Sequence, residues 1–216
     1  MRKRNIPAWY YQQFDADHTR DVPGEGYGGW KKAVLGLDLD KTALVVMHAW
    51  DCGHYEDHPG WFRAVEYIPR AEHIAATVFP PLLQAFRERS LAVLHVAYDE
   101  AQAGDHPGYK ATLDIIERHG VPGTSPALPH AEEDEVSKTL KAFRNDHVFV
   151  GTHNQEDVRK GFAKLDFMKQ AMPKEGECVV VDSNQLHAVC LEKKLNHLIY
   201  IGFAINWCLQ YNPGNM

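Results

Sequence analysis

The sequence predicts an α/β protein with a mainly parallel sheet. Short runs of apolar, branched residues recur along the chain, with the length of strands that are buried on both faces. Between them lie segments in which apolar residues have helical spacing. Strands that alternate with helices are joined by right-handed crossovers and therefore form a mainly parallel sheet. The 216 residues, 44% of them hydrophobic, favour one main domain with a substantial core.

The first 40 residues differ from the rest in having no apolar period. They are rich in Tyr, Trp, Gly and Asp. We expect residues 1–40 to form an ordered arm with little regular structure, which wraps the domain or a neighbouring subunit. Residues 41–216 would then form the main domain.

The first half of the main domain is predicted to contain two strands and two helices. Residues 43–47 form a continuous apolar run, which indicates the first strand. Residues 68–90 have helical spacing, with a kink or restart at Pro80 and Pro81 because Pro80 has no amide proton. A second strand is expected at 91–98. A helix is expected at 110–119, ended by Gly120.

The second half continues the alternation. HVFVGT (147–152) and ECVVVD (177–182) predict two more strands, with a helix near 155–170 between them. Ser183 or Asn184 would cap the next helix. HLIYIG (197–202) predicts the last strand.

Composition narrows the classes of partner. The net charge is −6 and no block of Lys and Arg stands out, so we expect no nucleic-acid partner. No apolar window approaches the roughly 18 residues that span a membrane, and the basic N-terminus has no apolar region of a signal peptide. Four cysteines lie apart without CxxC spacing, which is typical of reduced thiols in a cytoplasmic protein rather than of a disulfide framework or zinc site. They are Cys52, Cys178, Cys190 and Cys208.

The candidate site follows from the rule that open α/β sheets bind ligands at the carboxyl ends of their strands. The residues at or just after these ends are His48, Trp50, Asp51, Tyr98, Asp99, Gly202 and, a few residues later, Cys208. Cys208 would begin a helix, where the dipole and free amides lower a thiol pKa and hold an oxyanion. The alternative is a small buried hydrophobic residue, which is how we interpret the other three cysteines.

The stretch GFAINWCL (202–209) resembles the nucleophile segment G-V-A-T-x-x-C-V of the isochorismatase-like cysteine hydrolases. TALVVMH and SNQLHAVCLEKKLNHLIYIG are similar to that family's opening strand and to the run before its nucleophile, so the resemblance covers about residues 42–100 and 134–210. It implies a Rossmann-like three-layer α/β/α fold and an Asp–Lys–Cys triad. It also implies a non-proline cis peptide, here Ala204–Ile205, and an oxyanion hole from the amides of Ile205 and Cys208. The implied reaction is hydrolysis of a small amide or related C–N substrate through a thioester-type acyl-enzyme.

The chain departs from the family's triad at two positions. His48 stands where the family has its catalytic Asp, and it would take the thiol proton, or Asp51 would supply a carboxylate instead. The alternatives are a hydrogen-bonded strand end for His48 and a turn role for Asp51. VSKTLKAF resembles the family's lysine run and puts Lys138 in that role, with Lys141 as the fallback and Lys174 nearer in sequence to the following helix. The alternative for Lys138 is a solvated surface lysine.

Aromatic residues are expected to wall the pocket around a small-molecule substrate. They are Trp50, Trp61, Tyr98, Phe203 and Trp207. Nicotinamidase-like members hold zinc through D-x-H after the second strand, but this chain has Asp99-Glu100-Ala101 there. We therefore expect no metal and no cofactor. The alternative is a divalent ion held by HYEDH (54–58), with His106 as a further histidine.

The end of the sequence bears on assembly. Pro213 and Gly214 would end the helix after Cys208, and the chain stops before the further strand–helix unit that the family has, so the domain is expected to be C-terminally short. An uncovered sheet edge promotes association, which predicts a homo-oligomer. Two other functions stay open: a catalytically silent binding or assembly protein, and a non-covalent ether hydrolase of the isochorismatase type.

Overall fold

A four-stranded parallel sheet forms the centre of the computed structural model, which describes residues 2–120, 132–212 and 214–216. Its strands have the order β7-β5-β3-β8, and all neighbouring pairs are parallel. Their bounds are β3 Thr42–Met47, β5 Ala92–Val96, β7 Cys178–Val180 and β8 His197–Gly202. The predicted α/β class with a parallel sheet is confirmed, and so are these four strands.

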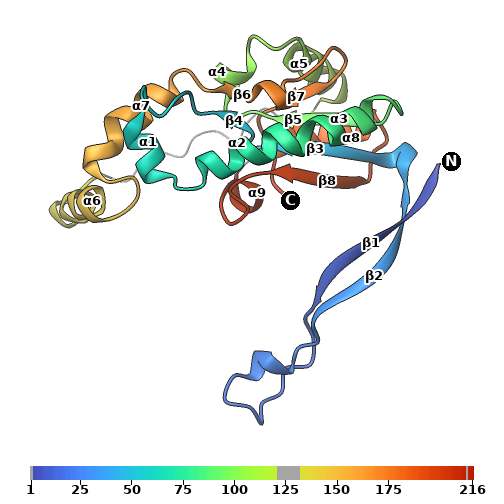
Figure 1. Cartoon of the computed structure of the whole chain (residues 1–216), viewed down its shortest axis with the longest axis horizontal. Coiled ribbons are helices and arrows are strands. Elements are labelled where there is room, and N and C mark those ends of the chain that lie inside the picture. Colours follow the sequence, from blue (N-terminus) through green and yellow to red (C-terminus); the bar gives the residue numbers. More distant parts are fainter. Residues whose placement is uncertain (1, 121–131, 213) are drawn as a thin grey trace.

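Helices cover both faces of the sheet (Figure 1). All six residues of β3 are buried, and alternate residues enter different cores. Leu44 and Val46 pack with α2 (Ile68–Thr77) and α3 (Phe79–Arg87). Val45 and Met47 pack in the core on the other face, to which α5 (Pro107–His119) and α8 (Ser183–Glu192) contribute. A strand buried on both faces requires the unbroken apolar run seen in the sequence.

The helix ends mostly agree with the sequence. The helix predicted at 68–90 restarts, with Pro80 and Pro81 in the first turn of α3, where no intrahelical amide bond is lost. Gly120 ends α5 with a φ of 58°, a left-handed conformation that suits glycine. The cap of α8 is a correction: the Asp182 carboxylate, not Ser183 or Asn184, accepts from the Gln185 amide.

The predictions for residues 147–170 were wrong in part. No strand forms at 147–152, because helix α6 (Glu135–His147) runs into this segment and is followed by a 3₁₀ turn, Thr152–Asn154. The helix α7 (Gln155–Phe162) is shorter than expected. It stops because the chain then forms β6 (Asp166–Phe167), which pairs antiparallel with β4 (Trp50–Asp51).

The N-terminal arm is more regular than predicted. β1 (Lys3–Gln12) and β2 (Gly29–Asp38) pair along their whole length as an antiparallel hairpin, which extends away from the α/β body in Figure 1. Aromatic and branched residues favour such strands even without an alternating pattern. The arm joins the body through Arg2, whose guanidinium donates to Asp40 and to the Arg89 carbonyl.

The remaining elements are short: α1 Pro59–Ala64, α4 Glu100–Ala103, α9 Cys208–Tyr211 and the 3₁₀ turns Pro23–Gly26, Leu39–Lys41 and Lys169–Ala171. Pro213, which the sequence suggested as a helix stop, lies outside the described residues. Within the described ranges, no helix has the length and apolar character to cross a membrane.

Candidate active site

The candidate site lies where the carboxyl ends of β3 and β8 meet. Met47 pairs with Gly202 at these ends, and the backbones approach so closely that a Cβ on Gly202 would lie 1.6 Å from the Met47 carbonyl oxygen. Just beyond them, His48 and Ala204 both adopt left-handed φ angles, 52° and 53°, which are rare for residues other than glycine. The two sharp turns bring His48 and Cys208 to the same edge of the sheet.

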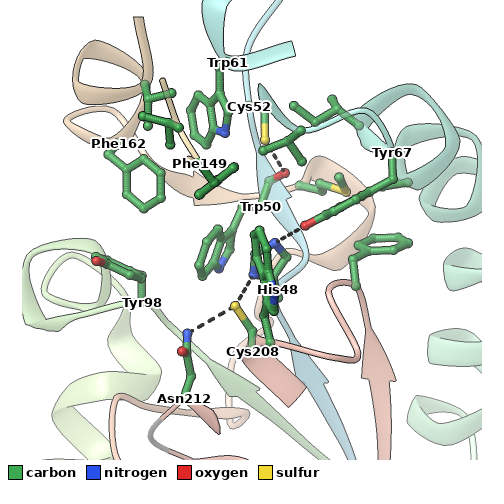
Figure 2. A pocket seen from close by; sticks show the side chains of 18 residues that line it. His48, Trp50, Cys52, Trp61, Tyr67, Tyr98, Phe149, Phe162, Cys208 and Asn212 are labelled. Atoms are coloured by element: carbon green, nitrogen blue, oxygen red, sulfur yellow. Dashed lines mark hydrogen bonds between the residues drawn. The ribbon is translucent and has the colours of Figure 1, made fainter. Parts of the chain in front are cut away.

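Four side chains form a continuous hydrogen-bonded chain at this edge (Figure 2). Nδ1 of His48 lies 2.8 Å from Sγ of Cys208, and Nε2 of His48 lies 3.1 Å from the Tyr67 hydroxyl. The side-chain amide of Asn212 donates to the same sulfur at 3.2 Å. The structure therefore brings together a thiol, a base, a group that orients the base, and a further donor.

Burial determines the protonation of the pair. It lowers the pKa of His48 to about 4 and raises the pKa of Cys208 to about 11. Both groups are therefore neutral near pH 7, as a thiol hydrogen-bonded to an imidazole. In the tautomer with the ring proton on Nε2, Nδ1 accepts a hydrogen bond from the thiol and Nε2 donates one to the Tyr67 hydroxyl.

The pKa of Cys208 is therefore raised, whereas the sequence led us to expect that it would be lowered. Helix α9 has only four residues, so few peptide dipoles act on its first residue, Cys208. The sulfur is also enclosed, with the residue only 7% exposed, and desolvation of the charged form outweighs the weak local field.

A cavity of about 310 Å³ opens beside the sulfur. Its walls are largely aromatic, and Figure 2 shows the rings of Trp50 and Tyr67 close to His48. The aromatic members are Trp50, Trp61, Tyr67, Tyr98, Phe149, Phe162, Phe203 and Trp207. Among the described residues that line it, none is Asp, Glu, Lys or Arg. The cavity therefore suits a small, uncharged and apolar or aromatic ligand.

The five aromatic residues predicted to wall the pocket all line this cavity. Trp50 packs directly on the imidazole of His48, with ring centroids 3.8 Å apart. Trp61 stacks on Phe162 with centroids 5.0 Å apart. These contacts hold the pocket walls and the imidazole in fixed positions.

Asp51 does not reach the cavity. It follows Trp50 in β4, and because neighbouring strand residues face opposite ways, the buried Trp50 leaves Asp51 exposed. Its carboxylate accepts from the Gly53 amide at 2.8 Å, which is the turn role. The structure thus favours His48 over Asp51 as the neighbour of the thiol.

Lys138 also lies away from the site, which corrects its placement from the resemblance. It belongs to α6, which buries none of its residues and lies well apart from α9 in Figure 1. Its ammonium pairs with Glu135 at 2.8 Å in solvent. The fallback Lys141 pairs in the same way with Glu133. Neither these two lysines nor Lys174 lines the cavity.

The cis peptide expected at Ala204–Ile205 is a further correction. Ala204 provides the turn through its left-handed φ instead, and its carbonyl accepts from the Trp207 amide at 2.9 Å. Ala204 and Ile205 do not line the cavity, and Ile205 is 61% exposed. Among the described residues the non-proline cis bond is Phe149–Val150, and both of its residues line the cavity.

Sequence reasoning missed Tyr67, Asn212, Phe149 and Phe162. Asn212 had a usable signal, because a residue four positions after Cys208 lies on the same face of a helix. Tyr67 had none, because only the fold brings the start of α2 to the end of β3. Phe149 was assigned to a strand that does not form.

The histidines considered for metal binding are dispersed. His58 is buried beside Trp61, and His106 bonds the Asp166 carboxylate at 3.0 Å. In the part of the chain that the structure describes, no three His, Cys, Asp or Glu side chains gather as metal ligands would.

No protein-family model, curated protein or solved structure matches this chain. What the site does must therefore be argued from its geometry.

Proposed function

We propose that this protein is a cysteine hydrolase that cleaves a small, uncharged amide or related C–N substrate through a thioester acyl-enzyme on Cys208. The observation that carries the proposal is the 2.8 Å contact between Cys208 Sγ and His48 Nδ1 at the wall of an enclosed aromatic cavity. A thiol paired with a base beside a ligand-sized cavity is the arrangement that nucleophilic catalysis needs.

The chemistry follows from a neutral pair. As the sulfur attacks the substrate's carbonyl carbon, His48 Nδ1 takes the thiol proton, so the thiolate forms only when a carbon is present to accept its electrons. The carbonyl oxygen then carries the negative charge, and the Asn212 amide, which lies 3.2 Å from the sulfur, would donate to it. Imidazolium passes its proton to the leaving nitrogen as the C–N bond breaks. Water, deprotonated by His48, then attacks the thioester and releases the acid and the thiol.

Tyr67 completes this scheme as a positioning residue. In the tautomer that this reaction uses, its hydroxyl accepts from Nε2 of His48, and the lone pair of the ring is on Nδ1, facing the thiol. The hydroxyl proton itself is held firmly, because burial is the largest of the causes that raise the pKa of Tyr67 to about 12.

The resemblance of residues 202–209 to the isochorismatase-like hydrolases supports the same reaction class. Its nucleophile position coincides with Cys208, and a parallel sheet with helices on both faces agrees with the Rossmann-like three-layer fold that it implies. Membership of that family remains part of the proposal. Because no described residue of the cavity is an Asp or a Lys, His48 would carry both proton transfers alone.

A second function is favoured by the same burial. With the thiol pKa raised to about 11 and no lysine at the cavity among the described residues, the site would also serve a binding protein that performs no chemistry, or a non-covalent ether hydrolase. These candidates differ from the first in one respect: neither needs the sulfur.

The experiment is intact-mass spectrometry of the protein incubated with uncharged aromatic amides, such as benzamide and nicotinamide, and with p-nitrophenyl acetate as an activated acyl donor. We expect an acyl adduct on Cys208 that Cys208→Ala and His48→Gln lose. Cys190→Ala is the matched control, because Cys190 lies outside the cavity, and it should keep the adduct. Turnover retained by Cys208→Ala would assign a non-covalent reaction, and absence of both adduct and turnover would leave a binding protein.

A further inference from the structure

The N-terminal hairpin presents a long surface that its own chain leaves uncovered. Directly opposed residues of an antiparallel pair share a face, so the register places Tyr11 with Trp30, Trp9 with Lys32 and Pro7 with Val34 on one side. On this aromatic face, Trp9, Trp30 and Val34 are 65%, 69% and 68% exposed. The opposite face mixes the apolar Ile6, Ala8, Tyr10 and Leu35 with the basic Arg4 and Lys31.

Such a hairpin requires a partner on physical grounds. A two-stranded hairpin without further packing is marginally stable in water, and contiguous exposed apolar surface marks a contact site. Two ring contacts support the aromatic face within the hairpin. Tyr11 meets Trp30 edge to face, and the Lys32 ammonium lies over the Trp9 ring. Figure 1 shows both strands extending clear of the α/β body, so the body of the same chain does not provide the cover.

A second apolar surface, which the described residues leave uncovered, lies on α6. Val136, Leu140 and Phe143 have the spacing of one helix face, and they are 65%, 63% and 60% exposed. An amphipathic helix that packs against its own domain buries this face, but α6 buries none of its residues. Because the chain thus exposes two elongated apolar surfaces on separate elements, each is available to the other in a second molecule.

Charge favours pairing the hairpin with the body rather than with another hairpin. Its two strands carry Lys3, Arg4, Lys31 and Lys32 against one acidic residue, Asp38. Two hairpins packed together would therefore repel. The whole chain has a net charge of −6, and residues 132–147 carry five acidic residues, four of them in the run 132–135, against three basic ones. A basic hairpin against an acidic helix end is electrostatically complementary.

We infer that the hairpin is a dimerisation arm, whose aromatic face packs on the Val136–Leu140–Phe143 face of α6 in a second copy of this chain, reciprocally about a two-fold axis. From the usual area of aromatic side chains, the aromatic face offers roughly 450 Å². Two aromatic faces and the two α6 faces that they cover would together bury about 1,800 Å², within the range of stable protein interfaces. The inference does not depend on the proposed reaction, because neither surface includes a residue that lines the cavity.

The test is light scattering coupled to gel filtration of the full chain. We expect a mass twice the 24.5 kDa of one chain. The double variant Trp9→Thr/Trp30→Thr keeps residues that favour strands and should halve the mass. Leu140→Ser/Phe143→Ser removes apolar side chains from the other surface, where they are exposed within one chain, and should halve the mass as well. Leu191→Ser, a 52% exposed leucine on α8, is the control that should stay dimeric.

Circular dichroism of each variant verifies that the α/β body is folded. A wild-type chain that is monomeric at micromolar concentration overturns the inference, and so does a dimer that survives either double variant. A dimer lost equally in Leu191→Ser would show a general loss of solubility or fold rather than a specific interface, and would also count against it.

Discussion

At the level of single residues, the site is defined by what burial does to two titratable groups. In many Cys–His pairs the charged thiolate–imidazolium form exists before substrate binds, since neighbouring charges and dipoles stabilise it. Here desolvation moves both pKa values toward the neutral forms, to about 4 for His48 and about 11 for Cys208. A thiol with a pKa raised in this way has a small thiolate fraction near pH 7, so its oxidation and alkylation there are slow.

The pH dependence of Cys208 alkylation tests this protonation state. We expect the rate of reaction with iodoacetamide, resolved by site with mass spectrometry, to keep rising from pH 7 toward pH 11. The thiolate fraction grows about tenfold for each pH unit below the thiol pKa. A rate plateau below pH 8 at Cys208, while the half-buried Cys190 continues to rise, would instead show a preformed ion pair with His48.

The role of Tyr67 gives a second prediction for a single residue. Tyr67→Phe removes the acceptor of the Nε2 proton, and we expect acylation of Cys208 to slow by about tenfold, the equivalent of one ordinary hydrogen bond. Nitrogen NMR of the imidazole should show a mixture of tautomers where the wild type has the proton on Nε2. Tyr55→Phe, which alters an exposed ring outside the cavity, should change neither measurement.

The sequence predicted part of this site well. The strand-end rule placed His48 and Cys208 together because both follow neighbouring parallel strands, and register carries such residues to one edge. It misplaced Asp51 and Lys138 for physical reasons. Strand alternation turns Asp51 outward, and a lysine motif on α6 carries no information on whether that helix packs near the sheet. Tyr67 could not be found because its contact with His48 is tertiary.

At the level of elements, the close approach of β3 and β8 positions the site. In Gly202→Ala the new Cβ would collide with the Met47 carbonyl oxygen. Gly202 also has a φ of 155°, which residues other than glycine rarely adopt. Because backbone must move, we expect a loss of more than about 4 kcal/mol in the free energy of unfolding, or failure to fold. Gly36→Ala in β2 is the matched control, since its Cβ would meet only the Asn5 side chain at 3.6 Å. Urea unfolding of both variants measures the contrast.

A buried ionic network ties α3, β5 and β7 together at the other end of the sheet. Glu177 accepts both a bidentate bond from Arg87 and a bond from His95 Nε2. Burial alone would raise the pKa of Glu177, but these bonds outweigh it and lower the pKa to about 2. A lowered carboxyl pKa stabilises the fold above its usual value of about 4.5, and this contribution is lost as the pH falls toward 2.

We therefore expect Glu177→Gln to lower the free energy of unfolding by roughly 3 kcal/mol at pH 7. At pH 3 the loss should be much smaller, because the wild type has itself lost part of the stabilisation that the ionised Glu177 provides. Glu156→Gln is the control. The pKa of Glu156 is also lowered to about 2 by its hydrogen bonds with Arg159, but this pair lies in solvent, where such pairs contribute little. Equal effects of the two substitutions at pH 7 would contradict the prediction.

The sequence predicted correctly those elements that are buried on both faces and those ends that a single proline or glycine sets. The 43–47 run reads as a strand because it is buried on both faces, and Pro80 and Gly120 act locally. The apolar segment 147–152 was misread because Val148 and Phe149 have no neighbouring strand and stay 49% and 44% exposed. The hairpin was missed because apolar and charged residues occur on both of its faces, which removes the alternation that marks a half-buried strand.

At the level of the whole molecule, stability is distributed unevenly. The sheet β7-β5-β3-β8 is covered by helices on both faces, whereas the hairpin and α6 carry exposed apolar surfaces and bury almost nothing within the chain. Local opening is easiest where few buried contacts resist it. The body should therefore fold without either element, and each should gain order only from what covers it.

Native-state hydrogen exchange measured across protein concentration tests this division. Amides of β3 should exchange most slowly at every concentration, because opening them requires global unfolding. Amides of β1, β2 and α6 should exchange rapidly in dilute solution and slow together as the concentration rises, because a dimer protects both surfaces by mass action. In Trp9→Thr/Trp30→Thr the protection of α6 should stop depending on concentration. If α6 stayed equally protected in that variant, its cover would have to come from somewhere other than the arm, and the two surfaces would not be partners.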